Sequence, residues 1–277
     1  MNIEDYLPKI FKKKKAALVL GGGSARGLAH IGVLKVLEKE KIRFDLIIGT
    51  SIGAFIGAFY ALGEDVSRAE SIAYQFNPRD SLDISLPPKM GLIRGNKIYN
   101  LMKDLFGEKE FSDLKIPMAI VATDIENGEE YIFRQGPLAD AIRVSCSYPG
   151  IFTPQRINGR LLVDGGIINT VPVSVARRLG ADVVVAVDVG FCVQAGEIKS
   201  IFGIILQAFQ ITGEELNRYQ AMEADLVIKP DLGAINQLDF DSAKIAIQKG
   251  EIAAMEKLKI LKKKVGIRHN GIQRRWS

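Results

Sequence analysis

One serine of this chain stands in a setting that could make it a nucleophile. It lies in the stretch Gly49-Thr50-Ser51-Ile52-Gly53, between an apolar run typical of a buried strand and one typical of a buried helix. Strand, Gly-x-Ser-x-Gly and helix form the arrangement of a nucleophile elbow. The turn is so tight that Gly49 and Gly53 must lack side chains, and the start of the helix favours an alkoxide. The pattern predicts a nucleophilic Ser51; a plain turn between strand and helix is the alternative.

A second glycine-rich turn follows the first apolar run of the chain and contains Gly21, Gly22 and Gly23. A dinucleotide-binding loop would need a further glycine where Arg26 stands, so the spacing does not fit that motif. Two interpretations remain open. The loop could be an oxyanion hole, in which N–H groups without a neighbouring Cβ approach a negative charge, or a tight turn between strand and helix.

A serine nucleophile needs a base, and the usual partner is scarce. The chain contains two histidines, His30 and His269. His269 lies in a basic C-terminal tail, where a mobile side chain is a poor catalyst. His30 lies about one turn into the first predicted helix, too deep to face a serine at the ends of the strands. The inventory therefore disfavours a Ser-His-Asp triad.

One carboxylate is better placed than either histidine. Asp164 follows a short apolar run and precedes Gly165 and Gly166, so it is expected on a sharp turn near the carboxyl edge of the sheet. A carboxylate there could accept the serine proton directly. The alternative is a turn aspartate that binds its own backbone, which is common for Asp-Gly. Asp188, at the end of a β-branched run, is a second and weaker candidate.

Strands alternate with helices along the whole chain. The expected strands cover residues 16–20, 45–48, 116–123, 130–133, 161–163, 182–187 and 226–229. The expected helices cover residues 28–37, 54–60, 66–76, 97–106, 138–144, 173–179, 200–218 and 242–264. This order predicts an α/β fold, with a mainly parallel central sheet covered by helices on both faces in three layers. We expect one domain over 16–264, between a basic segment, 1–15, and a basic tail, 265–277.

Composition narrows the class of protein. A hydrophobic fraction of 47% and a charged fraction of 25% over 277 residues are those of a globular protein with a sizeable core. The two cysteines have neither metal-ligand nor disulfide-framework spacing, which suits a reducing cytosol. The sequence shows no secretory signal and no apolar run long enough to span a bilayer. These features predict a cytoplasmic protein that at most touches a membrane surface.

Basic residues gather at the two ends. Residues 1–15 contain five lysines, and residues 257–277 contain eight lysines or arginines and no acid. Such ends could attract anionic bilayers, while solvated termini are the simpler interpretation. Aromatic and basic residues do not alternate there, so nucleic acid is not an expected partner.

Three motifs in this order resemble the signatures of the patatin-like phospholipase family, and of its bacterial members in particular. They are Gly21 to Gly27, Gly49 to Gly53, and Asp164 to Gly166; the segment 145–154 is also similar to that family. The resemblance covers residues 16–190. It implies a patatin-like fold of three α/β/α layers.

The resemblance also implies roles for single residues. The family uses a Ser-Asp dyad, so Ser51 would be the nucleophile and Asp164 the base. Gly21, Gly22, Gly23 and Ser24 would form the oxyanion hole, with Arg26 helping to hold or polarise it. The substrates would be acyl esters of lipids, and no metal or cofactor would be needed.

Other functions are compatible with the same residues. An acyltransferase would use the same dyad and pass the acyl group to an alcohol. A lipid- or protein-binding regulator without activity could keep the fold, and a nucleotide-binding protein fits the glycine spacing poorly. We also expect either the apolar stripe of the helix 201–209 or the aperiodic excursion 77–96 to cover the acyl groove and meet lipid. Ordinary core packing is the alternative for the helix.

Overall fold

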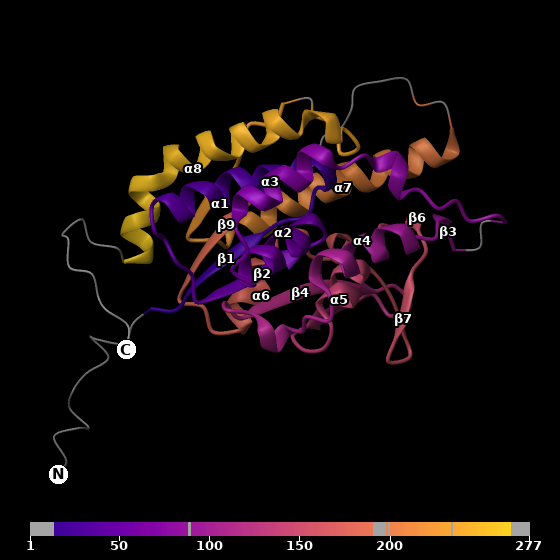
Figure 1. Ribbon diagram of the computed structural model, residues 1–277, viewed down its shortest axis with the longest axis horizontal. Helices are drawn as coiled ribbons and strands as arrows, with labels where there is room; N and C mark the ends of the chain where they lie inside the picture. The colour runs from indigo at the N-terminus through magenta and orange to yellow at the C-terminus, as the bar shows by residue number, and fades with distance from the viewer. Residues whose placement is uncertain (1–13, 88–89, 191–197, 199, 234, 267–277) are drawn as a thin grey trace, which may run out of the picture.

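The computed structural model describes residues 14–87, 90–190, 198, 200–233 and 235–266, and its centre is one eight-stranded sheet (Figure 1). The strands lie in the order β10-β9-β1-β2-β4-β8-β7, and β5 also pairs with β4. Five strands run parallel: β1 (Ala16–Leu20), β2 (Leu46–Thr50), β4 (Met118–Asp124), β9 (Val183–Val187) and β10 (Leu226–Ile228). Three are antiparallel to their neighbours: β5 (Glu129–Phe133), β7 (Gln155–Ile157) and β8 (Arg160–Asp164). The predicted mainly parallel sheet is confirmed.

Helices cover both faces of this sheet. The helices are α1 (Ala29–Lys39), α2 (Ile52–Ala61), α3 (Val66–Gln75), α4 (Asn96–Phe106), α5 (Leu138–Ser145), α6 (Val173–Arg178), α7 (Ile201–Met222) and α8 (Ala243–Val265). Alternate residues of β1 point to opposite sides, as a strand requires. Leu18 and Leu20 pack with α1 to α5 and α8, whereas Ala17 and Val19 pack with α6 and the end of α7. The predicted three layers are therefore present.

The excursion 77–96 is more ordered than its sequence indicates. It contains β3 (Gly91–Ile93), which pairs in parallel with β6 (Gly150–Phe152) in a small second sheet. Ser85 N donates to Leu92 O (2.8 Å) and Arg94 N to Asp83 O (2.9 Å), so residues 83–87 and 90–94 run antiparallel as the two arms of a hairpin. Strands of three residues show no readable period, and the partner of β3 lies far along the chain. Local pattern could not reveal this sheet.

The ends of the chain bear on two of the predictions. No helix among the described residues is both long and apolar enough to cross a membrane. The basic segment 1–15 and the basic tail 265–277 lie almost entirely outside the described residues. Their attraction to anionic bilayers, and the domain boundaries set by them, stay predictions.

Candidate active site

The register of the sheet brings Ser51 and Asp164 together. Thr50, the last residue of β2, pairs with Val121 of β4, and Asp164, the last residue of β8, pairs with Ala122. Val121 and Ala122 also both pair with β5, which occupies the other edge of β4. The strands β2 and β8 therefore approach each other end to end along one edge of β4. Their last residues meet there, and Ser51 comes directly after.

Ser51 sits on a strained turn. Its backbone has φ 53° and ψ −125°, a left-handed conformation that is uncommon outside glycine. A Cβ on Gly49 would lie 2.6 Å from Ala54 Cα, and a Cβ on Gly53 would lie 2.1 Å from Leu20 O. Both positions therefore require glycine, and the turn has the geometry that the Gly-x-Ser-x-Gly pattern predicts.

A second serine holds this turn. Ser51 N donates to Ser145 Oγ (2.8 Å), and Ser145 Oγ donates in turn to Val121 O (2.7 Å). Ser145 is fully buried at the end of α5. Ser145 begins the segment 145–154 that resembles the family, but no local pattern assigned a role to it, because its partners lie far away in the chain. Its hydroxyl ties the N–H of the candidate nucleophile to the central strand.

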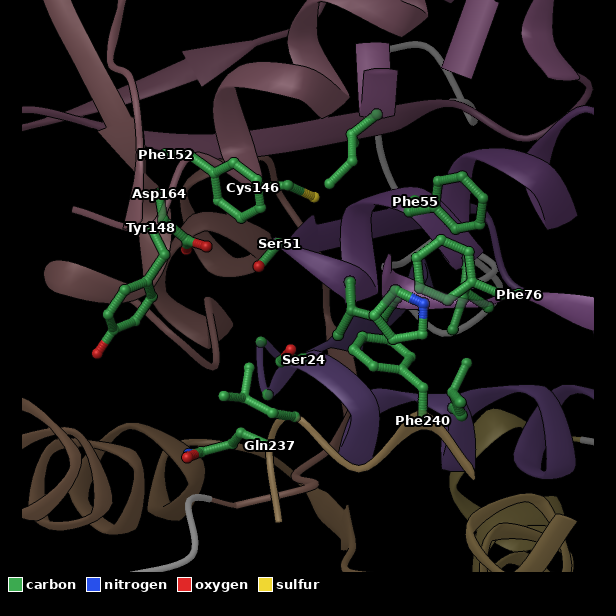
Figure 2. A pocket seen from close by; sticks show the side chains of 18 of the residues that line it. Ser24, Ser51, Phe55, Phe76, Cys146, Tyr148, Phe152, Asp164, Gln237 and Phe240 are labelled. Carbon is green, nitrogen blue, oxygen red and sulfur yellow. The ribbon is translucent and has the colours of Figure 1, made fainter. Parts of the chain in front are cut away.

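Asp164 is buried beside Ser51, and the two side chains face one another (Figure 2). Burial raises the pKa of its carboxyl to about 6, although the neighbouring Ser51 side chain and the hydrogen bond from Gly166 N act in the opposite direction. Gly166 N lies 2.8 Å from Asp164 Oδ1, and Asp164 N donates to Ser147 O (3.0 Å). Gly165 lies against the backbone of β4, where a Cβ would be 2.4 Å from Val121 O.

The glycine loop lies beside the same serine, but its N–H groups are not equivalent. Gly21 N donates to Val187 O (3.1 Å) and Gly22 N to Thr170 O (3.0 Å), so these two donors are already used. The N–H groups of Gly23 and Ser24 find no acceptor within the described part of the chain, and both residues line the cavity that contains Ser51. The predicted set of four donors is thus reduced to Gly23 and Ser24.

Arg26 lies behind the loop rather than at Ser51. Its Nε donates to Val189 O (2.9 Å) and Gly190 O (3.2 Å), and its Nη1 donates to Ile235 O (2.8 Å) and Gly233 O (3.2 Å). The side chain is buried and does not line the cavity. Of the two predicted roles, this geometry fits holding the loop and not polarising an oxyanion.

The other titratable candidates, His30 and Asp188, make contacts that belong to the fold and not to Ser51. His30 is fully buried, its Nε2 lies 2.8 Å from Gly21 O, and burial lowers its pKa to about 4. Asp188 accepts from Gly190 N (2.9 Å) and lies 3.4 Å from Lys229 Nζ. Neither lines the cavity, and His269 lies outside the described residues. His30 is a buried structural residue, as its position in the helix predicted.

A cavity of about 340 Å³ opens from Ser51 into an apolar interior. Figure 2 shows Phe55, Phe76 and Phe240 gathered on one side of Ser51, with Asp164 on the other. The apolar walls come from α2, α3 and α4, and include Phe59, Ile72 and Met102. Cys146 also lines the cavity, and burial raises the pKa of its thiol to about 12, so the thiol stays protonated. The described residues contain no cluster of three or more His, Cys, Asp or Glu suited to a metal ion.

Comparison with known proteins places the chain in a family. Residues 18–177 match the patatin-like phospholipase family. The chain is 35% identical over 237 residues to human patatin-like phospholipase domain-containing protein 6, covering 83% of this chain and 17% of that protein. It is 38% identical over 176 residues to an uncharacterised NTE family protein of Mycobacterium tuberculosis, covering 62% of this chain and 48% of that one.

A solved structure supports the fold. The crystal structure of VipD from Legionella pneumophila aligns with a TM-score of 0.54 at 14% identity, covering 91% of this chain and 67% of that one. The chain thus spans less than half the length of the human and mycobacterial relatives. It shares its architecture with VipD. The sequence match covers all three motifs, from the glycine loop to Asp164. The chain belongs to the patatin-like phospholipase family, as its motifs predict.

Proposed function

We propose that this chain hydrolyses carboxylic esters of lipids through an acyl-Ser51 intermediate, with Asp164 as the base. The observation that carries the proposal is that the Ser51 and Asp164 side chains face one another at the head of an apolar cavity (Figure 2). A buried carboxylate with a pKa of about 6 is a better base than an exposed one, and is still ionised at neutral pH. No histidine takes part.

The reaction has two steps. Ser51 Oγ attacks the ester carbonyl while Asp164 accepts its proton, and the proton then passes to the leaving alcohol. A water molecule then attacks the acyl-enzyme while Asp164 accepts its proton, and that proton passes to Ser51 Oγ as the bond to the acyl group breaks and the fatty acid leaves. The strained turn presents Oγ at the N-terminus of α2, where the helix dipole stabilises negative charge.

The oxyanion is stabilised by backbone donors. Gly23 N and Ser24 N, which have no acceptor within the described part of the chain, are the donors that the glycine loop offers. Ile52 N, the donor that follows the nucleophile, lies at the start of α2 and is in the same condition. Gly21 and Gly22 act indirectly, because their bonds to Val187 and Thr170 fix the loop.

The cavity receives the acyl chain. Its volume of about 340 Å³ is within the usual range for ligand pockets, and its walls are mostly apolar. Phe55, Phe76 and Phe240 lie on the side of Ser51 away from Asp164, while Tyr148 and Phe152 lie beside Asp164, so aromatic side chains flank the two residues on both sides (Figure 2). Phospholipids, lysophospholipids and simple acyl esters all present the required carbonyl, so a substrate panel decides among them.

The test compares the wild type with Ser51→Ala on that panel. The wild type should release fatty acid and react with a fluorophosphonate probe, and Ser51→Ala should do neither. Ser71→Ala, which changes an exposed serine of α3, is the matched control and should behave as wild type. Acyl transfer to an added alcohol, in place of fatty acid release, would identify an acyltransferase. A wild type that is folded, unlabelled and inactive on every ester would contradict the proposal.

A further inference from the structure

A hairpin beside the cavity exposes large apolar side chains. Residues 83–87 and 90–94 form its two arms, and β3 in the second arm pairs with β6 in the small second sheet. Four apolar side chains are between 45% and 76% exposed to solvent: Ile84, Leu86, Met90 and Leu92. Exposed apolar groups gathered in this way mark surfaces that meet another apolar phase.

The N-terminal half of α7 exposes a second set. The sequence from Ile201 to Gly213 contains no charged residue, and no described side chain of 201–212 is buried. The C-terminal half differs, since Gly213, Asn217 and Ala221 are buried at a spacing of four residues. Five large apolar side chains are exposed in the N-terminal half: Ile201, Ile204, Ile205, Phe209 and Ile211. Core packing therefore accounts for only the second half of this helix.

Both sets lie at the mouth of the cavity. Leu82 and Ile93 at the base of the hairpin and Leu206 on α7 all line the cavity. Leu82 and Leu238 line it and are also exposed, so they mark the place where it opens. Figure 1 shows the hairpin, labelled at β3, and the start of α7 at the same end of the molecule. An acyl chain that enters from outside has to cross this apolar border.

We propose that this border enters the surface of a phospholipid bilayer, so that a lipid moves from the bilayer into the cavity without crossing water. We call it the apolar rim and define it by Ile84, Leu86, Met90 and Leu92 of the hairpin and Ile201, Ile204, Ile205 and Phe209 of α7. The inference rests on the proposed function. Continuity of the rim with an apolar cavity favours lipid as its occupant, because lipid matches both surfaces.

Binding through the apolar rim and binding through the basic ends of the chain would depend differently on the charge of the lipid and on salt. The α7 part of the rim carries no charge, so its attraction comes from burial of apolar area and is insensitive to salt. Binding through lysine and arginine side chains would need anionic lipid and would weaken as salt rises. Binding to zwitterionic vesicles at high salt is therefore the signature of the rim.

The experiment measures sedimentation with phosphatidylcholine vesicles in the Ser51→Ala background, where no lipid is consumed. One variant carries Ile84→Ser and Leu86→Ser, and another carries Ile201→Gln and Ile204→Gln; none of these residues lines the cavity. Ile252→Gln with Ile260→Gln on α8 is the matched control, because both isoleucines are exposed and also lie outside the cavity lining. Vesicle affinity should fall by about tenfold or more in each rim variant. The control should bind as the parent does, and high salt should change none of these results.

Two results would overturn the proposal. One is equal binding of rim variants and parent, including no binding by either. The other is a rim variant that changes the association state in sedimentation velocity without changing vesicle binding, which would make the rim a contact between two copies of the chain. Hydrolysis of a soluble monomeric ester by the wild type, with Ser51 in place, tests the proposed function separately. Vesicle binding is measured without turnover, so either idea can fail alone.

Discussion

The two side chains of the dyad are held in place by different means. Ser51 is fixed by its backbone, through a positive φ, two close glycine contacts and the hydroxyl of Ser145 on its N–H. Asp164 has an extended backbone with φ −52° and ψ 133°, and is held by hydrogen bonds to Ser147 O and from Gly166 N. The contrast indicates that damage to the serine turn costs folding, whereas damage to the carboxylate costs chemistry.

The largest effect is expected where only chemistry is removed. Asp164→Asn keeps the size of the side chain and its acceptor for Gly166 N, but removes the base. We expect kcat/KM for ester hydrolysis to fall by about a thousandfold, the usual range for a general base. Activity of the wild type should also drop as pH falls through about 6, as Asp164 becomes protonated. A variant with more than a tenth of wild-type activity would remove Asp164 from the mechanism.

The serine turn should respond in the opposite way, with a loss of stability. An alanine at position 53 would place its Cβ 2.1 Å from Leu20 O, which is backbone and cannot move aside. We expect Gly53→Ala to lower the free energy of unfolding by about 3 kcal/mol, and activity to disappear with the turn. Denaturant unfolding measures the first effect.

Gly57→Ala in the same helix is the matched control for that change. Its Cβ would meet Met118 Cε at 2.9 Å, the far end of a flexible side chain that can move. It should cost clearly less stability and leave activity in place. Equal losses for the two variants would show that α2 tolerates no added methyl group, and that the turn at Ser51 is not special.

Asp164 should show a smaller effect on stability, and one of unusual sign. Burial raises its pKa from 3.8 to about 6, so the folded state binds the proton more tightly than the unfolded state. The stabilising contribution is present below about pH 4 and is lost as pH rises through 6. At pH 8 the buried carboxylate costs on the order of 3 kcal/mol at most.

Asp164→Asn should therefore be more stable than wild type at pH 8, and the difference should shrink toward pH 4. Unfolding measured by denaturant between these values follows it. A variant that is less stable at pH 8 would show that the carboxylate stabilises the fold. The statement that damage to the carboxylate costs chemistry rather than folding would then be wrong.

The same contrast explains how much the sequence could predict. The helices and the longer strands were predicted within a few residues, because each shows its own period of apolar residues. The serine turn could also be predicted from the sequence, because its steric crowding requires glycine on both sides of the serine. Asp164 was predicted as the partner of Ser51 from its expected place at the carboxyl edge and from the family resemblance, but how the two residues meet could not be predicted, because it depends on the register of β2 and β8 on β4. The role of Ser145 could not be predicted for the same reason, because it also depends on residues that are distant in the sequence.

The glycine loop shows the limit most clearly. Four consecutive residues, 21 to 24, looked equally suited to an oxyanion hole. Val187 O and Thr170 O occupy the first two N–H groups, and both acceptors come from more than a hundred residues away in the sequence. Sequence pattern identifies a loop that can bind an anion, but only the packing of distant strands decides which donors remain.

The smallest predicted effect concerns the hydrogen bond that holds the backbone of Ser51 beside Asp164. Ser145→Ala removes the acceptor of Ser51 N and leaves Val121 O without its hydroxyl donor. The turn keeps its glycines, so the protein should fold, but Ser51 Oγ should lose its exact orientation toward Asp164. We expect kcat to fall by about tenfold, with little change in KM, since misplacement of a reacting atom acts on the transition state.

Ser147→Ala supplies the matched control for that change. Ser147 Oγ is equally buried in the segment that follows α5, where it donates to Arg143 O (2.8 Å) and accepts from Arg143 Nη1 (2.5 Å), and neither bond involves Ser51. Loss of either buried hydroxyl leaves partners unsatisfied and should cost about 1–3 kcal/mol of stability. Only Ser145→Ala should also slow turnover. If both variants lose the same stability and the same kcat, Ser145 supports the fold in general, and the backbone of Ser51 needs no separate hold.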